Sequence, residues 1–108
     1  MTLKEFERLT EEFMSNCHGT LVVKGGEYAT LDRLHNFKVA AAFLGVPVKQ
    51  ALWGMLVKHL VSLSDMCMSP ENFPLSVWDE KIGDSACYLA LLNAVVKEPS
   101  ILAEREGC

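Results

Sequence analysis

Apolar residues recur along this chain at intervals of three and four positions, and four segments show the pattern. Such spacing places apolar side chains on one face of an α-helix, whereas a half-buried strand requires strict alternation. The predicted helices span residues 3–17, 30–44, 47–68 and 77–97. We therefore expect an all-α fold, a bundle of four to five helices in which the third and fourth form the long central pair.

Local sequence signals set the expected ends of the first three helices. Thr2 and Glu5 have the form of a capping box, in which a hydroxyl and a carboxylate cap the first turn reciprocally. Thr30 is the expected N-cap of the second helix, and Gly45 is expected to end it. Pro47 suits the first turn of the third helix, which we expect to be the longest in the chain.

The segments between and after these helices carry weaker signals. Residues 20–23 form a short β-type run that is expected to pair locally at most, and residues 24–30 form a glycine-bearing loop. Ser76, with Asp79 three residues on, is the expected cap of the fourth helix. Pro99 predicts a short final helix or a frayed tail after it.

Size and composition limit the classes of protein that fit. A chain of 108 residues, half of them apolar, is expected to form one domain over residues 1–108. A net charge of -4 argues against general binding to nucleic-acid backbones, which needs a basic face. No signal peptide is recognised, and charged residues or proline interrupt each apolar stretch, so we expect a soluble cytoplasmic protein with no membrane span. The four cysteines show no metal-ligand spacing and are expected to be free thiols, buried or partly buried, in a reducing compartment.

The third helix carries few polar residues, and they are aligned. Lys58, Ser62 and Asp65 recur at i, i+4 and i+7, which places them in one stripe. His59 lies beside this stripe and shares a face with Ser62. These residues are candidates for a site between helices, and equally for a solvent-exposed face that keeps the bundle soluble.

A comparable stripe follows the fourth helix, at Glu80, Asp84 and Tyr88. If the two stripes face each other, a lysine and an imidazole meet carboxylates inside the bundle, as in ligand sites of helix bundles. The alternative is an exposed acidic helix start, which the helix dipole stabilises without any site.

Arg33 and Asn36 form a third polar pair, on the second helix. Arg33 follows a glycine-bearing loop, and a guanidinium in that position suits bidentate contact with phosphate oxygens. It suits equally well a surface ion pair with Asp32 or Glu27.

Several quoted stretches together resemble one known family. They are EKIGDSACYLALL, the string KGGEYATLDRLHNFKVAA, the pair Lys58-His59 and the later run DSACYLALLNAVV. These stretches resemble the MazG-like all-α NTP pyrophosphatase superfamily, in particular small phage-encoded proteins associated with nucleotide modification. The resemblance covers roughly residues 20 to 97.

The resemblance implies a nucleotide cleft, and this chain departs from the family in its acidic residues. In the superfamily, carboxylates from two helices hold magnesium, which bridges the phosphates of a nucleoside triphosphate. Asp84 matches the family's aspartate after glycine, whereas Lys81 takes the place of the usual glutamate and Glu80 lies one residue upstream. On the third helix only Asp65 is acidic. Because lysine cannot ligate magnesium, a cation here is expected to contact phosphate directly.

Three hypotheses follow, and no catalytic residue is assigned. The first is a protein that binds or sequesters a nucleotide or nucleotide-derived signal, such as a host defence signal, with weak or no hydrolysis. Its expected ligand-binding residues are Lys24, Tyr28, Arg33, Asn36, Lys58, His59, Ser62, Asp84 and Tyr88.

The second hypothesis is a magnesium-dependent nucleotide pyrophosphohydrolase whose metal is held by Glu80, Asp84 and Asp65. The third is a phage protein-interaction module that inhibits a host factor and presents Phe43, Trp53 or Trp78 to it. Family members of this kind form oligomers, so we also expect a homo-oligomer, in the cytoplasm of a phage-infected or prophage-bearing bacterium.

Overall fold

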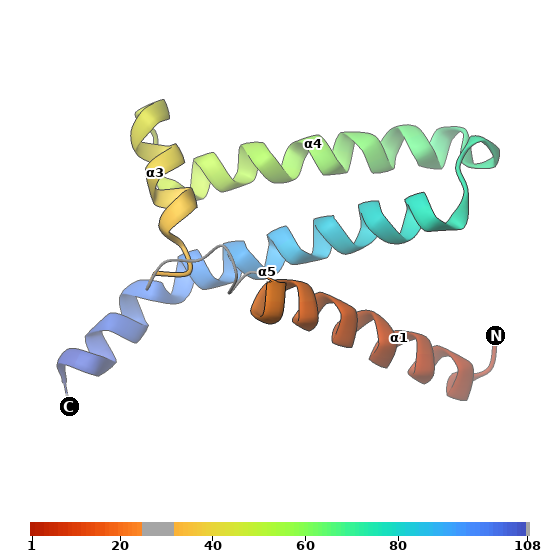
Figure 1. The fold of residues 1–108 in the computed structure, drawn as a ribbon, viewed down its shortest axis with the longest axis horizontal. Coiled ribbons are helices and arrows are strands. Elements are labelled where there is room, and N and C mark those ends of the chain that lie inside the picture. Colours follow the sequence, from red (N-terminus) through yellow and green to blue (C-terminus); the bar gives the residue numbers. More distant parts are fainter. Residues whose placement is uncertain (25–31, 108) are drawn as a thin grey trace.

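The computed structural model describes residues 1–24 and 32–107, and it shows helices joined by turns, with no strand among these residues (Figure 1). The prediction of an all-α fold is confirmed. The elements in chain order are α1 (Leu3–His18), the π-helical segment η1 (Gly19–Lys24), α3 (His35–Leu44), α4 (Val48–Met68), the 3₁₀ turn η2 (Pro70–Asn72) and α5 (Leu75–Glu106).

The centre of the fold is the antiparallel pair of α4 and α5, which the turn around η2 joins (Figure 1). The third and fourth predicted helices are thus the long central pair, as expected. Leu52 and Leu56, both on α4, are the most deeply buried large side chains, with 0% and 1% of their surface exposed. α3 packs against α4 after a bend of 98° between the two helices.

Most of the residues predicted to begin or end the first three helices do so in the structure. Thr2 and Glu5 form the reciprocal capping box at the start of α1. Gly45 ends α3 in the left-handed conformation, with φ of 67°, and its amide donates to carbonyls of the last turn. Pro47 is the N-cap of α4. Thr30, the expected cap of the second helix, lies outside the described residues.

The prediction for residues 20–23 is wrong. These residues continue α1 as the π-helical segment η1 instead of forming an extended run. Thr20 Oγ1 donates to the Asn16 carbonyl at 3.1 Å, one turn back. Because the preceding helix is already formed, each added residue extends it at low cost, and this outweighs the β-type preference of so short a run.

Three predictions about the last helix are also wrong. α5, with 32 residues, is longer than α4, with 21. It begins directly after Pro74, without a cap from Ser76, because the extended Pro74 carbonyl already accepts from the amides of Val77 and Trp78. It also continues through Pro99 to Glu106. Pro99 has no amide to donate to the carbonyl four residues back, that of Val95, a residue that is partly exposed.

α1 is strongly amphipathic, yet none of its residues is buried. Its C-terminal end lies against α5, and the two helices diverge towards the N-terminus (Figure 1). The apolar face of α1 is therefore left largely open.

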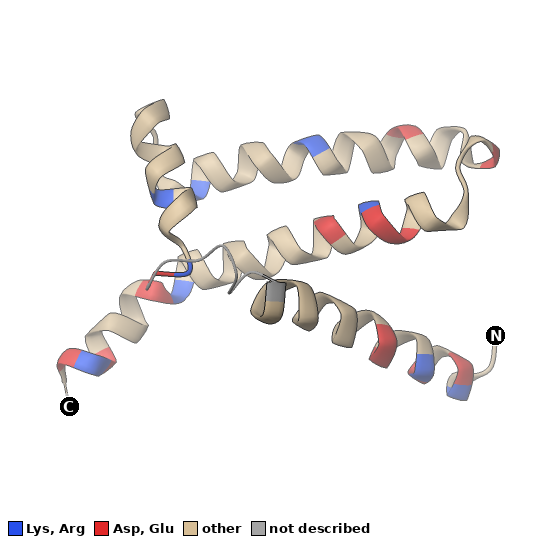
Figure 2. Ribbon diagram, in the orientation of Figure 1, with Lys and Arg blue, Asp and Glu red and all other residues tan. Residues whose placement is uncertain are grey.

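Few charged residues interrupt the central pair. Residues 85–96 of α5 contain no acidic or basic side chain, and charges gather instead on α1 and towards both ends of α5 (Figure 2). By length and hydropathy α5 is a candidate membrane span, and with α3 and α4 counted as one bent span there are up to two. Such helices are weak evidence of membrane insertion, because core helices of soluble proteins pass the same test.

Two glycines provide a matched test of the backbone. Gly45→Ala is expected to destabilise the protein by about 1–2 kcal/mol, because an L-residue resists the left-handed conformation found there. Gly54→Ala lies inside α4 with open space around an added Cβ, and is expected to stabilise by about 0.5–1 kcal/mol. Urea unfolding followed by circular dichroism at one protein concentration measures both. Equal effects would contradict the described end of α3.

Candidate functional site

Three of the predicted site residues meet between α4 and α5. His59 on α4 lies with its Nδ1 3.9 Å from Oδ2 of Asp84 on α5, too far for a hydrogen bond but close enough for attraction when the imidazole is protonated. The His59 and Tyr88 rings lie 5.0 Å apart, centroid to centroid, and are tilted by 31°. Asp84 and Tyr88 are four residues apart, so one face of α5 carries both.

These side chains are partly open to solvent. The His59 side chain is 22% exposed and that of Asp84 is 41% exposed. Because both side chains keep part of their hydration, they can lie between the helices without every polar atom having a hydrogen-bond partner in the protein. They also remain accessible to a ligand.

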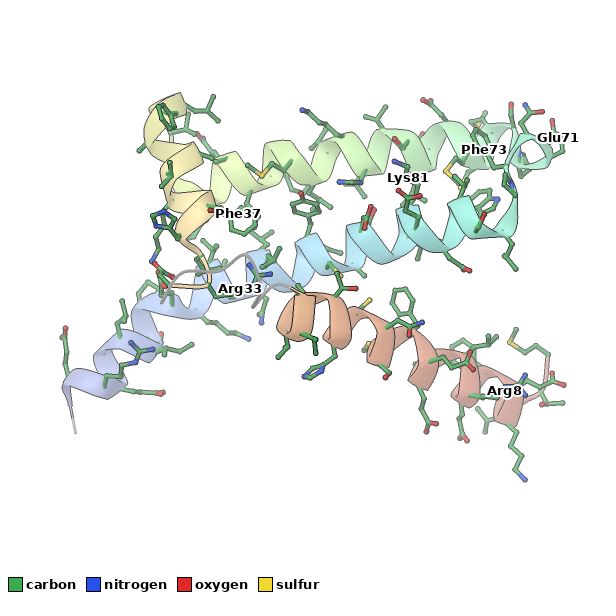
Figure 3. All side chains as sticks on the ribbon, viewed as in Figure 1. Arg8, Arg33, Phe37, Glu71, Phe73 and Lys81 are labelled. Atoms are coloured by element: carbon green, nitrogen blue, oxygen red, sulfur yellow. The ribbon has the colours of Figure 1, made fainter. Side chains whose placement is uncertain are left out.

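The remaining residues of the helix stripes are arranged differently from the expectation. Lys58 is exposed on α4, and His59 is the residue that faces the acidic stripe. The half-buried Ser62 donates its hydroxyl to the Lys58 carbonyl at 3.1 Å. Lys81 extends from α5 towards α4 (Figure 3), so it is this lysine that reaches the space between the helices.

The acidic residues of α5 also border a second space, a groove of about 670 Å³ between α1 and α5. Glu80 and Asp84 line it together with Asp79, and Glu12 contributes a fourth carboxylate from α1. Asp84 therefore belongs both to the His59 contact and to the wall of this groove, whereas Glu80 borders the groove and is exposed.

Asp65, the third predicted metal ligand, is exposed near the C-terminal end of α4, next to the turn that leads to α5. His59 lies opposite Asp84, so Asp65 lies six residues, or about 9 Å, farther along α4. Within the described residues no three His, Cys, Asp or Glu side chains come close enough to hold a metal ion. In the described structure Asp65 is thus not grouped with Glu80 and Asp84, and a magnesium site at the latter two would need ligands beyond this predicted set.

Two further predicted ligand-binding residues lie near the start of α3. Arg33 and Asn36 are both exposed, and Arg33 Nε donates to the Leu21 carbonyl at 3.3 Å. The guanidinium thereby ties the beginning of α3 to η1 (Figure 3). The Lys24 side chain and Tyr28 lie outside the described residues.

An ion-pair group that the sequence did not indicate links α3 to α5. Lys38 Nζ lies 2.6 Å from an oxygen of Asp32 and 2.9 Å from an oxygen of Glu98. The Lys38 hydrogen bond, aided by the Leu34 amide, lowers the pKa of Asp32, and the Asp32 hydrogen bond raises the pKa of Lys38. Spacings of 6 and 60 residues match no helical repeat, so no sequence signal marks this group.

A second unpredicted contact joins α1 to α5. The buried Cys87 thiol lies 3.9 Å from the Cys17 backbone oxygen. Burial, and next the neighbouring Cys17 thiol, raise the pKa of Cys87 to about 11. Cys17, Cys67 and Cys87 are free thiols; Cys17 and Cys87 are partly buried and buried, as predicted, whereas Cys67 is exposed.

Comparison with known protein families, curated proteins and solved structures finds no match. The proposed relationship to MazG-like proteins therefore depends on the motifs quoted above.

The raised pKa of Cys87 gives a test of this packing. Below pH 11 the folded protein holds Cys87 as the neutral thiol, and at pH 8 only about one molecule in a thousand carries the reactive thiolate. Iodoacetamide is therefore expected to label the exposed Cys67 at least tenfold faster than Cys87, as measured by peptide mass spectrometry. In denaturing urea the two rates are expected to converge. Equal rates in the folded protein would contradict the described burial.

Proposed function

We propose that this protein binds a nucleotide, or a nucleotide-derived signal, and holds it with weak or no hydrolysis. The observation that carries the proposal is the meeting of His59, Asp84 and Tyr88 between α4 and α5. A protonated imidazole donates to phosphate, a carboxylate accepts from sugar hydroxyls or base amino groups, and a phenol ring stacks on a base. These are the three kinds of contact that a nucleotide needs.

Cations around this group support a phosphate-binding role. Lys58 precedes His59 on α4 and is exposed, and Lys81 extends from α5 towards α4. In the family that the chain resembles, a carboxylate stands at the position of Lys81 and helps to hold magnesium. A lysine there favours direct contact with phosphate, since an ammonium is a donor and not a metal ligand.

The proposed location, assembly and biological role of the protein follow from its resemblance to MazG-like proteins. It places the protein in the cytoplasm of a phage-infected or prophage-bearing bacterium, as a MazG-like protein that assembles with further copies of itself. A protein that binds a nucleotide signal of host defence without hydrolysing it efficiently would serve to sequester that signal. The net charge of -4 favours a small ligand held by a few placed cations over a nucleic acid.

A protein-interaction role is the second candidate, and exposed aromatic residues favour it. Phe43 is 87% exposed at the end of α3, and Trp53 is 51% exposed on α4. A host factor that binds these side chains is expected to shield both. Trp78, the third predicted contact, is only partly exposed.

Calorimetry with canonical, modified and cyclic nucleotides tests the nucleotide proposal. At least one nucleotide is expected to bind, and His59→Gln is expected to weaken its binding about tenfold or more, because one hydrogen bond to a charged group is lost. His18→Gln is the matched control, since His18 is exposed on α1 and lies outside the group of His59, Asp84 and Tyr88. No binding by any member of the panel, or binding unchanged by His59→Gln, would refute the proposal.

Turnover is measured separately with the same nucleotides. The hydrolase alternative requires magnesium-dependent release of pyrophosphate that is lost in Asp84→Asn, because Asp84 is the matched family carboxylate. We expect no efficient release, since within the described part of the chain no three His, Cys, Asp or Glu side chains come together to hold a metal. Rapid release that Asp84→Asn abolishes would establish the hydrolase, with a metal site completed by further residues.

A further inference from the structure

Large apolar side chains on one side of α1 and of α5 are open to solvent. On α5, Leu75, Ile82 and Leu89 follow one another at intervals of seven residues, so they share one side of the helix. They are 75%, 41% and 53% exposed. On α1, Leu9 is 43% exposed although the helix is strongly amphipathic. Stripes with this spacing are normally the surfaces through which a helix packs against another element.

The groove between α1 and α5 brings the two stripes together. Leu9 and Phe13 of α1 and Leu75 and Ile82 of α5 line the same space of about 670 Å³. The lining runs along α5 from Leu75 to Cys87, which is about 18 Å of helix. Because α1 and α5 diverge towards the N-terminus (Figure 1), the groove is open at that end. A third helix of about twelve residues matches its length.

The polar part of the groove lining is acidic. Glu12, Asp79, Glu80 and Asp84 contribute to it, and the described residues that line the groove include no lysine or arginine. Lys81, next to Glu80 in the chain, extends towards α4 instead (Figure 3). Four carboxylates around an apolar groove attract a positively charged partner and repel a negatively charged one.

The helices of a second copy do not suit this groove. α1 carries four acidic and two basic side chains, and α5 carries six acidic and three basic ones. A second copy that laid either helix in the groove would bring carboxylates against carboxylates, and like charges opposed across an interface cost free energy. The groove therefore favours a different protein as its partner, whatever assembly the chain forms through its other surfaces.

The chain has enough uncovered surface for such a partner. Its accessible surface is 8080 Å², whereas a compact protein of 12.0 kDa exposes about 6,000 Å². A specific interface of standard size covers about 800 Å² on each partner, which is less than this difference.

We propose that the groove between α1 and α5 binds an amphipathic helix of another protein, one whose polar face is basic. Its apolar side chains, at the i, i+3, i+4 and i+7 positions of a helix that lies in a groove, meet the apolar lining. Its lysines or arginines meet the carboxylates along the edges. This site lies on α1 and α5, whereas the exposed Phe43 and Trp53 lie on α3 and α4, and it requires no nucleotide.

Calorimetry of the full chain with designed peptides of about 18 residues, or about 27 Å as a helix, tests the site. A leucine–lysine peptide with leucine at helical spacing is expected to bind with a micromolar Kd. A peptide of the same composition in scrambled order is expected to bind at least tenfold more weakly, since it keeps the charge but has no apolar face. A leucine–glutamate peptide with the ordered pattern is expected not to bind.

Substitutions in the groove separate its apolar and acidic contributions. Leu75→Gln is expected to weaken the leucine–lysine peptide about tenfold, because an apolar contact is lost. Asp79→Asn is expected to weaken it about two- to fivefold and to reduce its salt dependence. Val61→Gln and Glu71→Gln are the matched controls, because both residues are exposed outside the groove, and each is expected to bind like the wild type. Equal losses in all four variants would overturn the proposal.

Photo-cross-linking to the wild-type chain gives a result that does not depend on how the variants fold. A benzophenone group on the leucine–lysine peptide is expected to attach to segments of α1 and α5. Cross-links confined to α3 or α4 would overturn the proposal, as would equal binding of the ordered and scrambled peptides. So would a dimer, or a chain bound to phosphatidylcholine–phosphatidylglycerol vesicles, that excludes the peptide, because a second copy or lipid would then cover the groove.

Discussion

The packing of α4 against α5 is the contact on which the rest of this structure depends. Leu52 and Leu56 on α4 and Cys87 on α5 are among the few residues withdrawn from water, whereas no residue of α1 is buried. Burying a leucine side chain contributes about 1.5–3 kcal/mol, so a core this small leaves a narrow margin against the entropy of ordering the chain. The packing of α4 against α5 also sets the positions of the candidate ligand-binding side chains on these two helices.

The same pairing explains how polar groups can lie between two apolar helices. His59 and Asp84 retain 22% and 41% of their side-chain exposure, so they do not bear the cost of an isolated buried charge. Deeper burial would demand complete pairing and leave no free group for a ligand. Greater exposure would let water compete with a ligand for each hydrogen bond. The partial exposure at this position suits reversible binding.

Sequence reasoning succeeded at several local signals, although not at residues 20–23, Ser76 and Pro99, and it failed where the cause was tertiary. The capping box at Thr2 and the end of α3 at Gly45 depend on a few neighbouring residues, and both are confirmed. Helical spacing predicted two polar stripes and left open whether they face each other or solvent; the structure brings His59, Asp84 and Tyr88 together, whereas Lys58 is exposed. The ion pairs of Lys38 depend on how α3 docks against α5, which no local pattern encodes.

Asp84 borders two spaces, one on each side of α5. It approaches His59 between α4 and α5, and it also lines the groove on the α1 side. A ligand bound to Asp84 between α4 and α5 would therefore also change the charge of the groove wall on the α1 side. Conversely, a cation held by the carboxylates of the groove would weaken the attraction between Asp84 and a protonated His59, because the charge of Asp84 would be shared between the two sides of the helix.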